Sequence, residues 1–128
     1  MGKFVRPETV TLTLADGDRL TVRKRLSAGQ QRARLSTCYV TGPDGMARPD
    51  VFAMGRATIL AFLVDWTLTD EGAAVPIRGL SIDELGLVID DLEGPEFADV
   101  REAIEGHERR ENEARELEKK TIAVGSGS

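Results

Sequence analysis

The stretch VFAMGRATILAFLVDW, residues 51–66, is the most apolar segment of the chain and decides the fold. Its apolar side chains recur around nearly the whole circumference of a helix instead of following one stripe. A helix that is apolar on most sides is buried on most sides. The pattern therefore predicts a central core helix over residues 51–66, with the other elements packed around it.

Residues 8–25, upstream of this helix, have the pattern of a β-hairpin. The sequence TVTLTL at 9–14 alternates threonine with valine or leucine, which places the apolar residues on one face. The dipeptide Asp16-Gly17 is a strong turn signal, and the alternation resumes at Leu20. Because an isolated hairpin is only marginally stable in water, its apolar face must pack on helices or on another strand.

Between the hairpin and the core helix, capping and turn residues predict one helix and one loop. Ser27 with Gln30 three residues later is a capping-box pattern, which predicts a helix over 28–40. The sequence TGPDGMARPD at 41–50 contains two glycines and two prolines and is expected to be a loop.

The segment after the core helix is expected to begin irregularly and then to form a short helix. Residues 67–80 contain two glycines and a proline, so they predict an irregular connection with a short extended piece at 74–77. Ser81 with Glu84 repeats the capping-box pattern and predicts an amphipathic helix over 82–93.

The last helix is expected to leave the core part of the way along its length. Pro95 suits the first helical position. One apolar face then follows, marked by Phe97, Val100, Ile104 and His107. Beyond this face most residues are charged, and three pairs of opposite charge at helical spacing favour a solvated helix: Glu105 with Arg109, Glu111 with Arg115, and Glu116 with Lys120.

Together these elements predict an α+β, mostly helical fold. It consists of an N-terminal β-hairpin packed on a small bundle of about four helices, with a charged C-terminal helix. Residues 1–107 are expected to form a single compact domain. Residues 108–128 are expected to form a charged helical extension that ends in a flexible tail, GSGS.

The composition argues against a disulfide-stabilised, a zinc-binding or a membrane-spanning protein. Of the 128 residues, 41% are hydrophobic and 30% are charged, as in an ordinary soluble domain. The single Cys38 excludes an internal disulfide, and one cysteine with one histidine disfavours a structural zinc site. The longest apolar run, residues 57–64, is far below the roughly 20 residues that span a bilayer. Since the first residues also lack an apolar signal segment, we expect a cytoplasmic protein without a membrane partner.

The net charge of −5 averages two unlike halves. Residues 1–60 carry ten lysines and arginines against five acidic residues, whereas residues 61–128 carry seven against seventeen. This asymmetry either guides docking to a charged partner, including head-to-tail association, or reflects two solvated faces of different sign. Both interpretations stay open at this point.

The sequence contains no motif that predicts an active site. Glycine-rich phosphate loops and the GxSxG motif are missing. Cys38 and His107 are a conceivable nucleophile–base pair. Their positions on separate helices instead favour a small buried thiol and a histidine at the edge of an apolar face. We therefore expect a protein that is not an enzyme and that has no cofactor or metal.

Two charged clusters are candidates for binding. One acidic cluster lies at a helix end and comprises Asp90, Asp91 and Glu93. It either forms a solvated turn or marks a contact with a basic partner. A metal site is not expected here, because it would need ligands from elsewhere in the chain. The basic run at 23–25 lacks interleaved aromatic residues and a nucleic-acid-reading motif, and the chain is acidic overall. Nucleic acid is therefore not an expected partner.

Three stretches of the chain resemble the tail assembly chaperones of long-tailed bacteriophages, the siphoviruses. They are LTLADGDRLTVRKRLSAGQQRAR at 12–34, RATILAFLVDWTLTDEGAAVPI at 56–77 and EGHERRENEARELEKK at 105–120. The resemblance implies a non-enzymatic protein of the host cytoplasm that binds the tape-measure protein, keeps it soluble and brings tail-tube proteins to it. It also implies a longer frameshifted product if the codons for 118–120 form an A-rich slippery stretch.

A chaperone for a long apolar helix needs exposed apolar surface, and it needs charge to stay in solution. We predict that the partner-binding residues are the exposed members of one apolar group together with the basic run: Phe52, Phe62, Leu63 and Trp66, with Arg23, Lys24 and Arg25. The apolar group has an alternative interpretation as core. The alternative function is a structural minor tail or head–tail connector protein of the virion, and self-association stays possible with either function.

Overall fold

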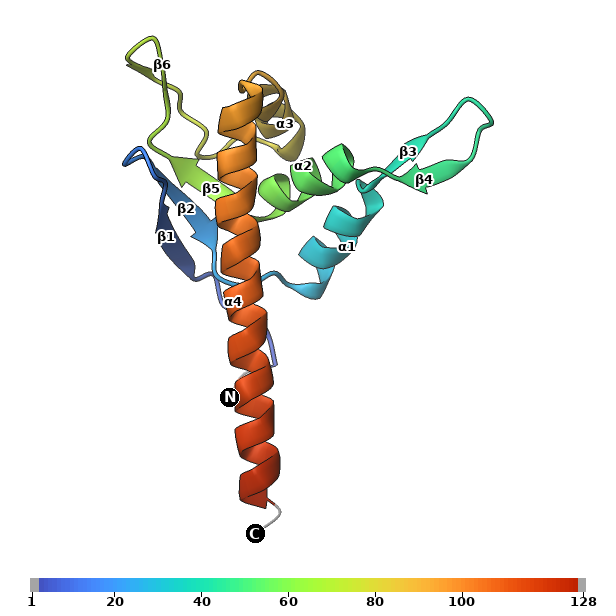
Figure 1. The fold of residues 1–128 in the computed structure, drawn as a ribbon, viewed down its shortest axis with the longest axis vertical. Coiled ribbons are helices and arrows are strands. Elements are labelled where there is room, and N and C mark those ends of the chain that lie inside the picture. Colours follow the sequence, from blue (N-terminus) through green and yellow to red (C-terminus); the bar gives the residue numbers. More distant parts are fainter. Residues whose placement is uncertain (1–2, 127–128) are drawn as a thin grey trace.

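We describe the fold from a computed structural model, which gives the backbone of residues 3–126 and the side chains of residues 3–120. Within that range the chain forms four helices and seven strands. Helix α4 (Gly94–Ser126) is the longest element, and the other elements gather around its N-terminal half while its C-terminal half projects (Figure 1). The predicted α+β, mostly helical fold with an N-terminal hairpin and a long C-terminal helix is confirmed.

The predicted hairpin forms one side of a small sheet. Strands β1 (Thr9–Thr13) and β2 (Arg19–Arg23) pair antiparallel with Val10 opposite Val22. Gly17 in the connecting turn has φ +94°, a conformation that glycine adopts without strain. Strand β5 (Leu63–Trp66) pairs antiparallel with β2 on its other side, so the sheet order is β1-β2-β5. The apolar face of the hairpin is thus covered by helices, and β2 is extended by a third strand.

The core helix α2 (Val51–Phe62) is shorter than predicted. Asp50 caps its N-terminus, and the Asp50 carboxylate accepts a hydrogen bond from Ala53 N at 2.8 Å. The predicted helix over 51–66 is wrong in its last four residues, because the backbone becomes extended at Leu63 and continues as β5. A short continuous apolar run fits a buried strand as well as a buried helix, so its pattern does not mark the change.

Helix α2 is the centre of the core and contacts the three other helices of the described range. These are α1 (Ala28–Ser36), α3 (Ile82–Asp90) and α4. The side chains with the least exposure come from the sheet and from three of the helices, and they form one continuous cluster: Leu20, Val22, Ile59, Ile89, Val100 and Ile104. The predicted apolar face of the last helix is therefore confirmed.

Both predicted capping boxes are present. In α1 the Ser27 hydroxyl accepts from Gln30 N, and the Gln30 amide oxygen accepts from Ser27 N at 2.8 Å. In α3 the Ser81 hydroxyl accepts from Glu84 N at 3.2 Å, while Glu84 Oε1 accepts from Ser81 N at 3.1 Å. Hydrogen bonding with the backbone N–H and the hydroxyl of Ser81 stabilises the charged Glu84 carboxylate. It holds the pKa of Glu84 below its ordinary value of 4.5.

Two segments predicted as helix end or loop form short hairpins instead. Helix α1 ends at Ser36 and not at residue 40, because β3 (Tyr39–Thr41) pairs with β4 (Ala47–Pro49). The turn between them is closed by Asp44 Oδ1, which accepts from Met46 N at 3.1 Å. Strands β6 (Thr69–Asp70) and β7 (Ala73–Ala74) form a second hairpin in the stretch predicted to be irregular. Figure 1 shows these two hairpins projecting on opposite sides of the molecule.

Helix α4 is continuous across the predicted domain border at residues 107 and 108. The three predicted ion pairs along it do not form; their acidic members pair with other residues, Glu105 with Arg101, Glu111 with Arg25, and Glu116 with Lys119. Of the predicted flexible tail, Gly125 and Ser126 belong to α4, and the last two residues lie outside the described range. Among the described helices, none combines the length and the apolarity that crossing a bilayer requires.

Candidate partner-binding surfaces

The basic run predicted to bind a partner is engaged in contacts within the chain. Each of its three side chains has a partner on a different element: Arg23 Nη1 donates to Ala61 O at 2.9 Å, Lys24 Nζ lies 3.5 Å from Glu8 Oε2, and Arg25 Nε lies 3.5 Å from Glu111 Oε2. These contacts join the end of β2 to α2, to the segment before β1 and to α4. The run therefore contributes to packing; Lys24 and Arg25 face carboxylates of the same chain, whereas Arg23 faces a neutral carbonyl oxygen.

The four apolar candidates separate into core and surface. Phe62 and Leu63 are each 2% exposed and Trp66 is 9% exposed, so these three belong to the core and are not available to a partner. The indole Nε1 of Trp66 donates to Val75 O at 2.8 Å, which fixes the ring inside the fold. Phe52 is 76% exposed. Of the predicted apolar surface, Phe52 is thus the member that the structure leaves accessible.

Phe52 is one of six large apolar side chains that are exposed on β3, the turn before β4 and the first turn of α2. We call this region of the molecule the hairpin surface and define it by these residues: Tyr39, Val40, Met46, Val51, Phe52 and Met54. Because successive strand residues point to opposite faces, Tyr39 and Val40 lie on opposite faces of the β3–β4 hairpin. Helix α2 begins directly where β4 ends, and both strands project away from the core (Figure 1). Of this set the sequence predicts only Phe52 as a binding residue, because its patterns assign Tyr39 and Val40 to a helix, Met46 to a loop, and Val51 and Met54 to the core helix. The apolar pattern of residues 51–54 does not distinguish an exposed first turn from the buried helix that follows it.

Cys38 and His107 do not form the conceivable catalytic pair in this structure, because each has its own partner. The Cys38 thiol donates to Arg34 O at 3.3 Å. His107 Nε2 lies 3.1 Å from both Arg23 O and Lys24 O. Since both neighbours of Nε2 are carbonyl acceptors, this nitrogen carries the hydrogen. His107 is 4% exposed and packs edge-on against a core phenylalanine ring, so it anchors α4 to the end of β2.

The acidic cluster at the end of α3 divides into two parts. Asp90 forms a bidentate pair with Arg56 of α2, at 2.8 and 3.1 Å. Asp91 and Glu93 form no ion pair with the side chains described, and both line a groove near the β6–β7 hairpin. Within residues 3–120, no group of three or more histidine, cysteine or acidic side chains is arranged to hold a metal ion.

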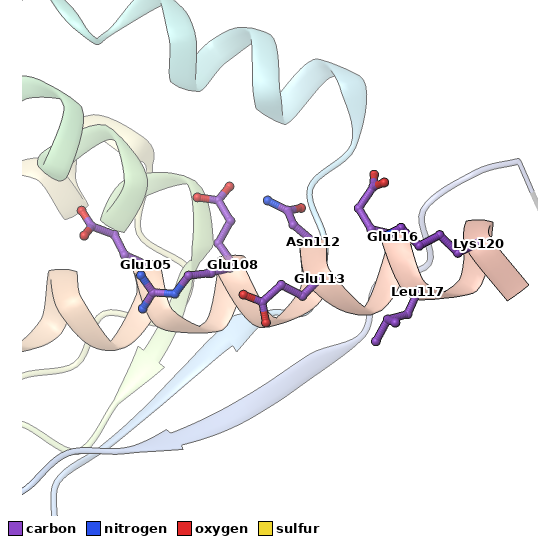
Figure 2. A pocket seen from close by; sticks show the side chains of 8 residues that line it. Glu105, Glu108, Asn112, Glu113, Glu116, Leu117 and Lys120 are labelled. Carbon is purple, nitrogen blue, oxygen red and sulfur yellow. The ribbon is translucent and has the colours of Figure 1, made fainter.

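The C-terminal half of α4 borders an open hollow of about 610 Å³. Its lining comes entirely from that helix and is polar except for Leu117. Figure 2 shows Glu105, Glu108, Asn112 and Glu116 on one side of the helix and Leu117 on another. A single helix with mixed charges presents a solvated flank here, as the sequence predicted for this segment.

Comparisons of the chain with protein-family models, with curated proteins and with solved structures gave no match. The hairpin surface and the distribution of charge are therefore the features that bear on function.

Proposed function

We propose that the protein is a non-enzymatic phage tail assembly chaperone that binds the tape-measure protein through the hairpin surface and promotes assembly of the tail tube. The observation that supports this proposal most directly is the exposure of the hairpin surface. Its six large apolar side chains are between 47% and 76% exposed and lie within sixteen residues of sequence. So many large apolar side chains exposed on neighbouring elements are typical of a protein-binding region.

The chemistry of the hairpin surface suits a long apolar helix as partner. Tyr39 and Phe52 offer rings that bury large areas, and Met46 and Met54 have flexible side chains that adapt to different neighbours. A tape-measure protein presents many similar apolar helical segments before the tube encloses it. An adaptable apolar surface binds such segments without requiring one sequence, and the charge on the rest of the molecule keeps the complex in solution.

The double variant Val51→Ser/Phe52→Ser tests the proposal. Both side chains are 76% exposed, so their loss should leave the thermal unfolding midpoint nearly unchanged. If they bind the tape-measure protein, their joint loss costs at least about 1.4 kcal/mol, and the affinity falls at least about tenfold. The measurement is the soluble yield of the tape-measure protein of the same phage on co-expression, with the affinity of the purified pair.

The matched control is Leu87→Ser/Leu117→Ser, which removes two apolar side chains of 68% and 65% exposure outside the hairpin surface. Equal loss of binding in both double variants would show that the hairpin surface is not the site.

Mass spectrometry of purified phage particles distinguishes the chaperone function from the alternative function. Stoichiometric presence in virions would contradict a chaperone and support a structural minor tail or head–tail connector protein.

A further inference from the structure

A groove of about 480 Å³ lies on the opposite side of the molecule from the hairpin surface. Its walls are the turn between β1 and β2, the β6–β7 hairpin and the connection from α3 to α4. In Figure 1 the β1–β2 turn and the β6–β7 hairpin lie on the left, and β3 and β4 lie on the right. The apolar part of the groove lining is formed by side chains of the core and its margin: Trp66, Leu68, Val75, Val88 and Leu92.

The walls of this groove carry acidic charge of one sign. Six carboxylates line it, and the lining contains neither lysine nor arginine: Asp16, Asp18, Asp70, Asp91, Glu93 and Glu96. Among the side chains described, none of the six forms an ion pair, although the nearby Asp65 pairs with Arg78 and Asp90 pairs with Arg56. Four acidic residues of the second half of the sequence thus meet two from the turn between β1 and β2 at this groove, and no basic side chain of the lining neutralises them.

Four of the six carboxylates also lack hydrogen bonds with the described part of the chain. Asp16 Oδ1 accepts from Asp18 N at 3.0 Å, and Asp18 Oδ1 accepts from Thr67 Oγ1 at 2.9 Å, so these two hold the turn between β1 and β2. The other four carboxylates hold no turn in this way: Asp70, Asp91, Glu93 and Glu96. Charged groups that face each other across an apolar floor without a counter-charge repel one another. A cationic partner relieves this repulsion.

We propose that this groove, which we call the acidic groove, binds a basic amphipathic segment of a partner protein. One large apolar side chain of that segment contacts the floor, where Leu68 and Leu92 lie, and flanking lysines or arginines face the carboxylates on the walls. Complementary charge sets the orientation and speeds encounter, while the apolar floor supplies contact area. The carboxylates are spread along the walls and do not converge as metal ligands do, which favours an extended cationic segment over an ion.

The proposal is independent of the tape-measure assignment, because the acidic groove shares no residue with the hairpin surface. Variants in one surface therefore test one proposal only. Failure of the hairpin variants would leave the acidic groove untouched, and failure of the groove variants would leave the chaperone proposal untouched.

The test uses the full chain and two synthetic peptides of equal length. One has lysine and arginine around a central leucine and tryptophan, and the other has glutamate in place of each basic residue. We expect the chain to bind the basic peptide with an affinity that falls as salt concentration rises. The variant Asp70→Asn/Asp91→Asn removes one charge from each of two walls and should weaken binding by about threefold to tenfold.

The control variant Glu113→Gln/Glu118→Gln makes the same change in net charge on the exposed end of α4, and it should bind the basic peptide like the wild type. Equal weakening in both variants would overturn the proposal, because it would show a response to net charge alone. Nuclear magnetic resonance shift changes confined to the groove lining, at residues 16–18, 66–75 and 88–96, would support it. Shift changes at the hairpin surface, equal binding of the acidic peptide, or self-association of the chain through the groove would each contradict it.

Discussion

At the scale of single residues, arginine side chains tie separate elements together. The guanidinium of Arg34 in α1 donates to both carboxylate oxygens of Glu108 in α4 and to Thr58 Oγ1 in α2, and it lies 5.9 Å from the ring of Phe62. The side chains of Arg34 and Glu108 are 19% and 20% exposed, so water screens this pair less than a surface pair. One arginine thus joins three helices.

Replacing Arg34 with alanine should lower the free energy of unfolding by about 1–3 kcal/mol, because Glu108 loses the charged donor that it faces in a half-buried position. Arg34→Lys should recover only part of this loss, since lysine keeps the charge without the two-pronged geometry. Urea unfolding measures both. Arg32→Ala, an exposed change in the same helix, should cost less than about 0.5 kcal/mol, and a cost equal to that of Arg34→Ala would contradict the assigned role.

At the scale of elements, local signals predicted starts and turns well, and they failed where pairing partners decide the structure. Alternation at 9–14, the turn at Asp16-Gly17 and the two capping boxes act within a few residues, and all are present. Residues 63–66 look like the continuation of a buried helix, but pairing with β2 makes them a strand. That pairing joins residues more than forty positions apart, which no local pattern encodes.

Helix α4 combines an anchored part and a projecting part, and the predicted border at residue 107 falls inside the anchored part. His107 holds two backbone carbonyls at the end of β2, and the next two contacts along the helix are Glu108 with Arg34 and Glu111 with Arg25. Residues 112–120 are exposed. The helix therefore extends its attachment to the domain by about one turn beyond the end of its apolar face.

Two truncations separate these parts. Ending the chain after Asn112 keeps all the anchoring contacts, so the free energy of unfolding should change by less than about 1 kcal/mol. Ending it after Gly106 removes His107, Glu108 and Glu111 together and should cost about 3–5 kcal/mol, because buried donors and acceptors lose their partners. Chemical unfolding of both proteins measures the difference. Similar losses would show that the projecting end packs on the core after all.

At the scale of the whole molecule, the surfaces that bear on binding are assembled from segments that are distant in sequence. The sequence identifies Asp91 and Glu93 as a possible contact with a basic partner, but Asp16 and Asp70 join them only in the folded chain. Likewise the basic run at 23–25 looks like a free cationic surface until α2 and α4 supply its partners. Composition predicts that a charge asymmetry exists, whereas folding decides which charges are neutralised.

The positions of the two proposed surfaces predict that the protein binds two partners at once. The β3–β4 hairpin lies on the opposite side of the molecule from the β1–β2 turn and the β6–β7 hairpin (Figure 1). Since the hairpin surface and the acidic groove also share no residue, occupation of one should not block the other. A saturating concentration of the basic peptide should therefore change the affinity for the tape-measure protein by less than about twofold, equivalent to about 0.4 kcal/mol. Calorimetric titration with and without the peptide measures this. Strong competition would show instead that both ligands use one surface.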